Sequence, residues 1–476
     1  MNKKIIISNT KITIIGISLA NEDLYRKFKN RLSVWSESKN GGVYVSWKAY
    51  IENEDEDTII IHKGISLYSL KYYFPDFDIE YDDSPNPSIN ITGNLIIAPR
   101  NKLQKDTIAY LNENKNTSQM FICLKPGSGK TYCTINYIMK KKITPIIIVD
   151  TNQILEQWKS SFLKFTDLEE SDIFTIAGSI TINRLMKRTN KPKIYLAMHR
   201  TLQSYCDDNW EKIDDLFSKL GIGIKVFDEA HVEWRNIFYI DINSNIKYTL
   251  YLTATPNRSN PSEKDCYKMM FGGTPMYGYE ESRTDKYIRF IDYHWNSKPN
   301  INQQASMKGS YGFDSNVYND YLLENKFDEF SKLLEELINT FNDKINGRKI
   351  AIVVNCKNMI SELSPIFSIL YNDVGIFCGL IPKKDRKKEL DHQIILTTLK
   401  GFNKAVDVKD LAVVINTINI SSDVLMEQIS GRLRYNKDYK SYFVQLTDDG
   451  FASFRLNGKT RIEIMQEIAH SIRVIE

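Results

Sequence analysis

The sequence predicts an α/β protein in which two tandem parallel-sheet units follow a small α+β unit. Three observations support this fold class. The chain has 476 residues, enough for about three domains of roughly 150 residues each. Its first part alternates apolar and polar residues, as half-buried strands do. The rest alternates short, wholly apolar runs with helical stretches, which indicates strands buried on both faces of parallel sheets.

Composition narrows the class of protein. With 42% hydrophobic residues, the chain has enough apolar material for several cores, and a mainly disordered protein is excluded. A net charge of only +4 places any contact with nucleic acid in local patches. Six dispersed cysteines without a CxxC pair predict reduced thiols, and equally dispersed histidines predict no zinc site. No apolar run approaches the ~18 residues of a membrane span. We therefore expect a protein of the cytosol, that of a host if the protein is viral.

Residues 1–93 are predicted to form the α+β unit, with paired strands around one amphipathic helix. The unit ends in Ser84–Asn94, whose Pro, Asn and Ser content is typical of a linker. Basic residues in Arg26–Arg31 lie near Trp35 and Trp47, a combination that suits phosphate contact and base stacking. We expect an accessory, nucleic-acid-binding domain with at least one of these tryptophans in its core.

Residues 94–295 are predicted to form the first α/β domain and residues 325–476 the second, joined by a polar linker, 296–324. The predicted strands of the first domain are Met120–Leu124, Pro145–Asp150, Lys193–Met198, Ile224–Asp228 and Tyr248–Thr255. Those of the second are Lys349–Asn355, Val374–Gly379, Gln393–Thr398 and Leu411–Asn416.

A glycine-rich turn, Leu124–Thr131, follows one predicted strand and precedes a predicted helix. Such a turn lets backbone N–H groups surround a phosphate at the positive end of the helix. Lys130 would neutralise the β- and γ-phosphates, and the Thr131 hydroxyl would bind Mg²⁺. Leu124 stands where the general phosphate-loop pattern has its first glycine. The matching residues are Gly127, Ser128, Gly129, Lys130 and Thr131.

Two adjacent carboxylates, Asp228 and Glu229, end another apolar run. Side chains at this position gather at the carboxyl edge of a parallel sheet, where the phosphate loop also belongs. Asp228 is expected to hold Mg²⁺ through water, and Glu229 to orient and deprotonate the attacking water. Together with Lys130, these carboxylates predict a nucleotide hydrolase.

Three segments occur in the order in which superfamily 2 helicases carry their motifs. They are Asp228–His231 (Asp-Glu-Ala-His), Leu252–Pro256 and Gln428–Arg434. The sequence resembles this family over residues 99–435. The resemblance implies two RecA-like motor domains that hydrolyse ATP with Mg²⁺.

The resemblance also implies roles for residues outside these motifs. Gln104 matches the glutamine that hydrogen-bonds the adenine base. Val149–Trp158 and Tyr195–Ser204 are similar to the segments that contact the nucleic-acid backbone. Asp407 matches the aspartate that approaches the ribose, although Ala405 replaces the family's glycine two residues earlier.

The second domain is expected to complete the site with Gln428 and Arg432, which fall where the family has them. Arg432 would stabilise charge on the γ-phosphate as an arginine finger. The family's second arginine falls at Tyr435, and Arg434 stands one position earlier. Either Arg434 reaches the site through a local shift, or Arg432 acts alone.

The leading hypothesis is an ATP-dependent DNA helicase or translocase of viral or phage replication or recombination, acting on single-stranded or branched DNA. A small domain ahead of a compact motor resembles the layout of phage UvsW-type helicases. Two alternatives stay open. One is a translocase that acts on RNA or releases transcripts, and the other is an ATP-gated nucleic-acid clamp subunit with weak turnover.

Overall fold

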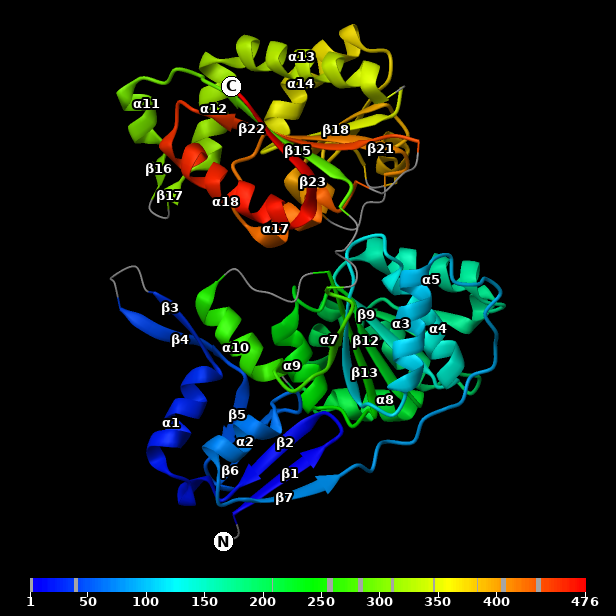
Figure 1. The fold of residues 1–476 in the computed structure, drawn as a ribbon. Helices are drawn as coiled ribbons and strands as arrows, with labels where there is room; N and C mark the ends of the chain where they lie inside the picture. Colours follow the sequence, from blue (N-terminus) through cyan, green and yellow to red (C-terminus); the bar gives the residue numbers. More distant parts are fainter. Residues whose placement is uncertain are drawn as a thin grey trace. The chain divides into compact units, whose positions relative to one another are not determined.

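The computed structural model describes residues 3–37, 42–207, 209–254, 260–280, 286–309, 312–345, 347–382, 384–403, 408–433 and 438–476. The chain divides into two compact units, Met1–Ser282 and Arg283–Glu476. Each unit contains a seven-stranded sheet, and the first contains a five-stranded sheet as well (Figure 1). None of the described helices is long and apolar enough to cross a membrane.

The first unit begins with the five-stranded sheet, in the order β5-β6-β2-β1-β7. Alternate residues of β1 (Lys4–Ser8) and β2 (Lys11–Ile15) are buried, as the apolar alternation requires. Helices α1 (Glu22–Arg31) and α2 (Leu67–Tyr73) contribute buried side chains to the same apolar cluster. The remaining strands are β5 (Tyr50–Asn53), β6 (Thr58–His62) and β7 (Asp78–Asp82). The predicted small α+β unit is confirmed.

The seven-stranded sheet of the first unit is parallel, in the order β10-β11-β9-β12-β13-β8-β14. Every residue of β8, β9 and β12 is buried, which explains why their sequences are almost entirely apolar. The strands are β8 (Gln119–Cys123), β9 (Pro145–Val149), β10 (Ile173–Ile176), β11 (Ile194–Met198), β12 (Ile224–Phe227), β13 (Tyr248–Thr253) and β14 (Met276–Tyr277). The helices are α3 (Lys102–Glu113), α4 (Lys130–Lys141), α5 (Asn152–Phe165), α6 (Ser179–Met186), α7 (His199–Cys206), α8 (Lys212–Leu220), α9 (Trp234–Ile242) and α10 (Pro261–Phe271).

The predicted linker after residue 84 is bound along its length to the parallel-sheet part of the first unit. The backbone N–H of Asn86 donates to the Asn245 carbonyl (3.0 Å), and that of Ile89 donates to the Gly221 carbonyl (2.8 Å). The Asn86 side chain also donates to Asp214 (2.6 Å). This segment is therefore an ordered, extended connection that is hydrogen-bonded to the parallel-sheet part, and Figure 1 shows it between β7 and α3.

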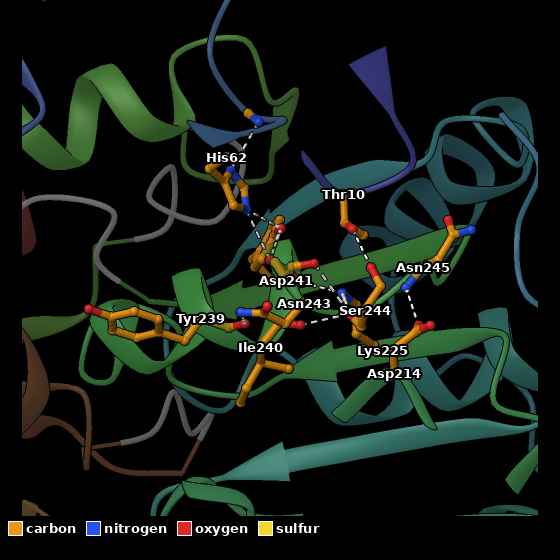
Figure 2. Close-up of polar contacts among 12 residues, drawn as sticks. Thr10, His62, Asp214, Lys225, Tyr239, Ile240, Asp241, Asn243, Ser244 and Asn245 are labelled. Atoms are coloured by element: carbon orange, nitrogen blue, oxygen red, sulfur yellow. Dashed lines mark hydrogen bonds and ion pairs between the residues drawn. The ribbon is translucent and has the colours of Figure 1, made fainter. Parts of the chain in front are cut away.

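A fully buried polar network joins the two sheets of the first unit (Figure 2). The Asp241 carboxylate of α9 accepts from Lys225 of β12 and lies 3.0 Å from Nε2 of His62 in β6. Tyr251 of β13 donates to it at 2.6 Å. Burial alone would raise the pKa of Asp241, but the Lys225 charge and the contacts with His62 lower it. The carboxylate is thus held in its charged form by groups from both sheets.

A second contact between the two parts is aromatic. The hairpin of β3 (Ser33–Glu37) and β4 (Val43–Lys48) places the Trp47 ring 4.7 Å from that of Trp234 in α9, between ring centroids. Trp47 is thus half-buried at the contact with α9, whereas a tryptophan in the core of the N-terminal domain was expected. Trp35 on the same hairpin is 38% exposed.

The second unit contains another parallel seven-stranded sheet, in the order β19-β20-β18-β21-β22-β15-β23. This confirms the predicted fold class of two tandem parallel-sheet units. Its strands are β15 (Ile288–Trp295), β18 (Lys349–Val354), β19 (Val374–Phe377), β20 (Ile394–Thr398), β21 (Leu411–Asn416), β22 (Ser441–Asp448) and β23 (Ala469–Ile475), with a short hairpin of β16 (Lys308–Gly309) and β17 (Gly312–Phe313). The helices are α11 (Ile301–Ser306), α12 (Ser315–Asn325), α13 (Phe327–Ile345), α14 (Lys357–Leu370), α15 (Arg386–Glu389), α16 (Leu399–Asn403), α17 (Asp423–Ser430) and α18 (Ala452–Ile468).

The structure differs from the predicted domain boundaries at 295 and 324. Strand β15 pairs with β22 and β23 and so belongs to the second sheet. The predicted linker 296–324 contains α11 and most of α12, where Tyr318 and Tyr321 are buried. Their hydroxyls donate to Asp448 (3.1 Å) and to the Ser297 carbonyl (2.9 Å). The segment is polar in sequence, yet its tyrosines pack into the core of the second unit.

We predict that Asp241→Asn strongly destabilises the first unit. The substitution keeps the size of the side chain but leaves the buried Lys225 ammonium without a counter-charge, a loss of about 3–5 kcal/mol in the free energy of unfolding. Denaturant unfolding measures this loss. The matched control is Asp215→Asn, which removes an exposed ion pair with Lys219 and should change stability by less than about 1 kcal/mol. Equal unfolding midpoints for the two variants would contradict the prediction.

Candidate nucleotide-binding site

The predicted phosphate loop connects β8 to α4. Gly127 and Gly129 have φ angles of +78° and +102°, in the left-handed region that favours glycine. Gly129 is the N-cap residue of α4, and no side chain of the described residues caps this helix end. The sequence therefore forms a turn whose backbone N–H groups and helix N-terminus suit an anion.

Two side chains of the loop have polar groups that suit the binding of a phosphate. The Ser128 hydroxyl is buried and has no hydrogen-bond partner among the described residues. The Lys130 ammonium donates to the Leu124 carbonyl oxygen at 2.8 Å. A phosphate in the loop would give the hydroxyl an acceptor and the ammonium a charged partner. Thr131, the predicted Mg²⁺ ligand, is half-buried at the first turn of α4.

Gln104, predicted to contact adenine, lies against this loop. Its side-chain oxygen accepts from the Arg100 N–H (2.9 Å), and its side-chain nitrogen lies 3.4 Å from the Ser128 carbonyl oxygen. A Cβ atom at Gly129 would lie 2.1 Å from that nitrogen, so the close approach needs glycine there. The structure thus brings Gln104 and the loop together.

The predicted carboxylates follow β12 at the same edge of the sheet. The two oxygens of Asp228 each accept one hydrogen bond, from the Glu229 N–H (3.0 Å) and from the Trp158 indole N–H (2.8 Å). Glu229 has a φ of +51°, a conformation that costs a non-glycine residue about 1 kcal/mol or more. Such strained conformations are typical of functional sites. Here the conformation of Glu229 turns the chain directly after β12.

The electrostatics of Asp228 connect the carboxylates to the phosphate loop. Burial and the neighbouring Glu229 carboxylate raise the pKa of Asp228 to about 6, against the opposing effects of Lys130 and the Trp158 hydrogen bond. Lys130 therefore lies close enough to act on this carboxylate. A divalent cation beside the pair would favour the charged form of Asp228.

The remainder of the Asp-Glu-Ala-His segment contacts the segment that begins at Leu252. The Nδ1 atom of His231 lies 2.9 Å from the Thr253 hydroxyl and 3.5 Å from the Glu229 carboxylate. Both His231 and Thr253 are buried. The structure thus links the two motif regions side chain to side chain. Thr255 and Pro256 lie outside the described residues.

The two segments predicted to contact nucleic acid each contain the carboxyl end of a strand, β9 or β11, and the start of the helix that follows it, α5 or α7. Thr151 caps α5, its side chain accepting from the Ile154 N–H. His199, the first residue of α7, is buried against Phe227 of β12, with ring centroids 5.8 Å apart. Neither ring nitrogen of His199 has a hydrogen-bond partner among the described residues.

The predicted residues of the second unit lie on or just after α17. Ser422 caps this helix, Gln428 is part of it, and Arg432 follows its end. Arg434, Tyr435, Ala405 and Asp407 lie outside the described residues. The roles of Gln428 and Arg432 stay predictions.

Sequence reasoning missed Arg461 of α18, a completely buried arginine. Its guanidinium donates to the Asn419 side chain (3.0 Å) and to the Ile420 carbonyl (3.2 Å), just before α17. A third bond reaches the Thr447 hydroxyl at 2.7 Å. Nothing in the sequence marks Arg461, because its partners come from distant segments.

Known proteins match the chain in three ways. Residues 95–258 match the family model of the type III restriction enzyme res subunit. The DNA 3′-5′ translocase XPB2 of Sulfurisphaera tokodaii is 23% identical over 453 residues, 84% of this chain and 94% of that protein. The putative helicase 161L of Invertebrate iridescent virus 6 is 26% identical over 151 residues, 31% of this chain and 30% of that protein. A fragment of a putative HsdR subunit of a type I restriction enzyme from Vibrio vulnificus YJ016 superimposes with a TM-score of 0.53 at 15% identity, over 91% of this chain and 76% of that chain.

These matches agree with the fold and the two motif regions. The likeness to the restriction-enzyme fragment supports the fold of the two parallel-sheet units. The family model spans the phosphate loop and both carboxylates. Together they support a superfamily 2 helicase, and the predicted enzyme class, an ATP-dependent nucleic-acid helicase or ATPase, is confirmed. The viral context and the UvsW-type layout stay predictions.

We predict that His199 makes stability depend on pH. Burial lowers the pKa of His199 to about 4, only partly opposed by Asp150 and Asp241, whereas an exposed histidine titrates near 6.5. The unfolded chain therefore binds a proton more readily, and the stability that neutral His199 provides is complete above pH 6.5 and is lost as the pH falls towards 4. His199→Phe should reduce the loss of unfolding free energy between pH 6.5 and 4.5 by roughly 2–3 kcal/mol.

Thermal or urea unfolding at several pH values measures this effect. The control is His470→Phe, since His470 is exposed and its substitution should leave the pH dependence of the wild type. If His199→Phe gives the same pH dependence as the wild type, the histidine is not held neutral.

Proposed function

We propose that the chain hydrolyses ATP at the edge of its first parallel sheet and couples hydrolysis to movement on, or unwinding of, DNA. One observation carries the proposal: the phosphate loop follows β8 and the two carboxylates follow β12, strands that flank β13 in one parallel sheet. Loop and carboxylates thus leave the sheet at the edge where open α/β sheets bind ligands. The effect of Lys130 on the pKa of Asp228 supports their proximity.

The proposed roles follow from the contacts. The N–H groups of the loop and Lys130 bind the phosphates, and Lys130 leaves the Leu124 carbonyl oxygen to do so. Thr131 and Asp228 hold Mg²⁺, which when bound neutralises charge on the β- and γ-phosphates. Glu229 orients the attacking water and accepts its proton.

Residues of the second unit and of α3 are proposed to complete the reaction. Arg432 stabilises the charge that develops on the γ-phosphate. Gln428, four positions earlier on α17, is proposed to act with it. Arg434 and Asp407 have the roles that the family resemblance implies, in contact with the γ-phosphate and the ribose. Gln104 hydrogen-bonds the adenine base, which requires its side chain to exchange its bonds with Arg100 and Ser128.

The proposed substrate is single-stranded or branched DNA, in viral or phage replication or recombination. The similarity to a protein named a DNA 3′-5′ translocase supports DNA, and that to an iridescent virus protein supports a viral context. The N-terminal α+β part, as in UvsW-type helicases, would help to engage the DNA. A translocase acting on RNA and a clamp with weak turnover are the alternatives that the next experiment separates.

We predict that Lys130→Ala abolishes nucleic-acid-stimulated ATPase activity, with a loss of about 100-fold or more in kcat, because the phosphates lose the charged partner at the start of α4. The measurement is the ATPase rate with single-stranded, forked and duplex DNA and with RNA. Lys141→Ala, at the other end of α4, is the control and should keep the wild-type rate. Stimulation by RNA alone would support the RNA translocase, and turnover that no nucleic acid stimulates would support the clamp.

We predict that Arg432→Ala reduces the ATPase rate by roughly 1000-fold and leaves ATP binding unchanged, because the finger acts on charge that develops only in the transition state. Binding of a fluorescent ATP analogue and steady-state hydrolysis measure the two properties. Arg455→Ala in α18, an exposed arginine of the same unit, serves as the control. An Arg432→Ala enzyme that keeps most of its turnover would show that another residue is the finger.

A further inference from the structure

The indole of Trp158 forms a hydrogen bond between helix α5 and the carboxylate that is proposed to hold Mg²⁺. Trp158 is 1% exposed, and its Nε1–H donates to Oδ2 of Asp228 at 2.8 Å. The two residues are 70 positions apart in sequence. An indole N–H can only donate, so this bond favours an acceptor, the charged carboxylate, at that place.

This bond and one backbone bond together determine how the Asp228 carboxylate is turned. Oδ1 accepts from the Glu229 N–H and Oδ2 from the indole. A carboxylate offers about four acceptor positions, so about two remain for a cation or its waters. Without the indole, one donor among the described residues, the Glu229 N–H, would be left to orient the group, next to the like charge of the Glu229 carboxylate. Groups that orient a metal ligand in this way usually matter nearly as much as the ligand.

Helix α5 is connected through β9 to the same edge of the sheet. It begins right after β9, and the backbone N–H of Asp228 donates to the Ile148 carbonyl of β9 at 3.0 Å. Trp158 packs beside Phe162 on the buried face of the helix, with ring centroids 6.1 Å apart. A shift of α5 relative to β12 would therefore change the distance from the indole to Asp228.

The opposite face of α5 is open to solvent. Asn152 and Gln153 in its first turn are exposed, as is Gln157 one turn further on. These residues belong to the segment Val149–Trp158, which resembles the nucleic-acid-contacting segment of superfamily 2 helicases. One short helix thus has polar side chains towards solvent and the Asp228 donor on its buried side.

We propose that Trp158 is a positioning residue that orients Asp228 for Mg²⁺ and makes this orientation depend on the nucleic-acid contacts of α5. The inference rests on the proposed function of Asp228 as a metal ligand. Nucleic acid on the first turn of α5 holds the helix where the indole bond is made, as it is in this structure, and keeps the carboxylate oriented for the cation. Loss of the indole N–H uncouples the two events without removing either site.

The test is Trp158→Phe, which keeps an aromatic ring and removes the donor. Binding of fluorescent ADP, measured without turnover over a range of MgCl₂ concentrations, should need about 10-fold more Mg²⁺ for its half-maximal effect, while binding without Mg²⁺ is unchanged. The stimulation of the ATPase rate by single-stranded poly-dT should fall by a similar factor. Trp158→Leu, which also lacks a donor, provides a second variant if the first does not fold.

The matched control is Phe162→Leu, which disturbs the same buried face of α5 but leaves the indole bond. If Phe162→Leu and Trp158→Phe have the same Mg²⁺ requirement and the same poly-dT stimulation, Trp158 only packs and the inference is overturned. Failure of the proposed function looks different: in that case Lys130→Ala itself would keep its ATPase activity and ADP binding.

Discussion

The buried carboxylate of Asp241 is the constraint on which the first unit depends. A charge taken out of water has to be paired and hydrogen-bonded where it lies. Here the partners come from two sheets: Lys225 of β12 supplies the counter-charge, and His62 of β6 supplies a hydrogen bond. His62 lies 179 positions before Asp241 in sequence. The packing of the five-stranded sheet on the seven-stranded sheet therefore completes the hydrogen bonds of the buried Asp241 carboxylate. The N-terminal α+β part is accordingly a fixed component of the first unit and not a module on a flexible tether.

Strand β12 transmits this constraint to the candidate site. Lys225 is the second residue of the four-residue strand, and Asp228 follows its last residue. The buried ion pair holds one part of the strand, and β9 and β13 hold its two sides. The carboxylates then leave the sheet through Glu229, whose left-handed backbone turns the chain at once. Their position is therefore set by the packing of a buried strand, which protects it from the movement of surface loops.

The features that depend on neighbouring residues in sequence, the central strands and the phosphate loop, were predictable from the sequence. Apolar runs predicted the central strands, because strands buried on both faces consist mostly of apolar residues. The spacing of Gly127, Gly129 and Lys130 predicted the loop. Contacts between distant segments were not predictable. Lys225 appears in sequence as one polar residue in an apolar run, and nothing nearby indicates that Asp241 neutralises it. The polar stretch before α12 suggested a linker, because composition does not reveal that Tyr318 is buried.

Trp158 and Arg461 show why such contacts matter for a motor. Each is a buried hydrogen-bond donor on a helix. Trp158 donates to Asp228 in the first unit, and Arg461 donates to Asn419 and Ile420, just before α17, in the second. A buried donor is costly to leave unpaired, so such bonds tend to be either fully made or broken together with their surroundings. If such a helix moves as one body, it makes or breaks the bond as a whole and so changes the orientation of a group that is distant in sequence. That behaviour is what the proposed coupling between nucleic-acid contact and hydrolysis requires.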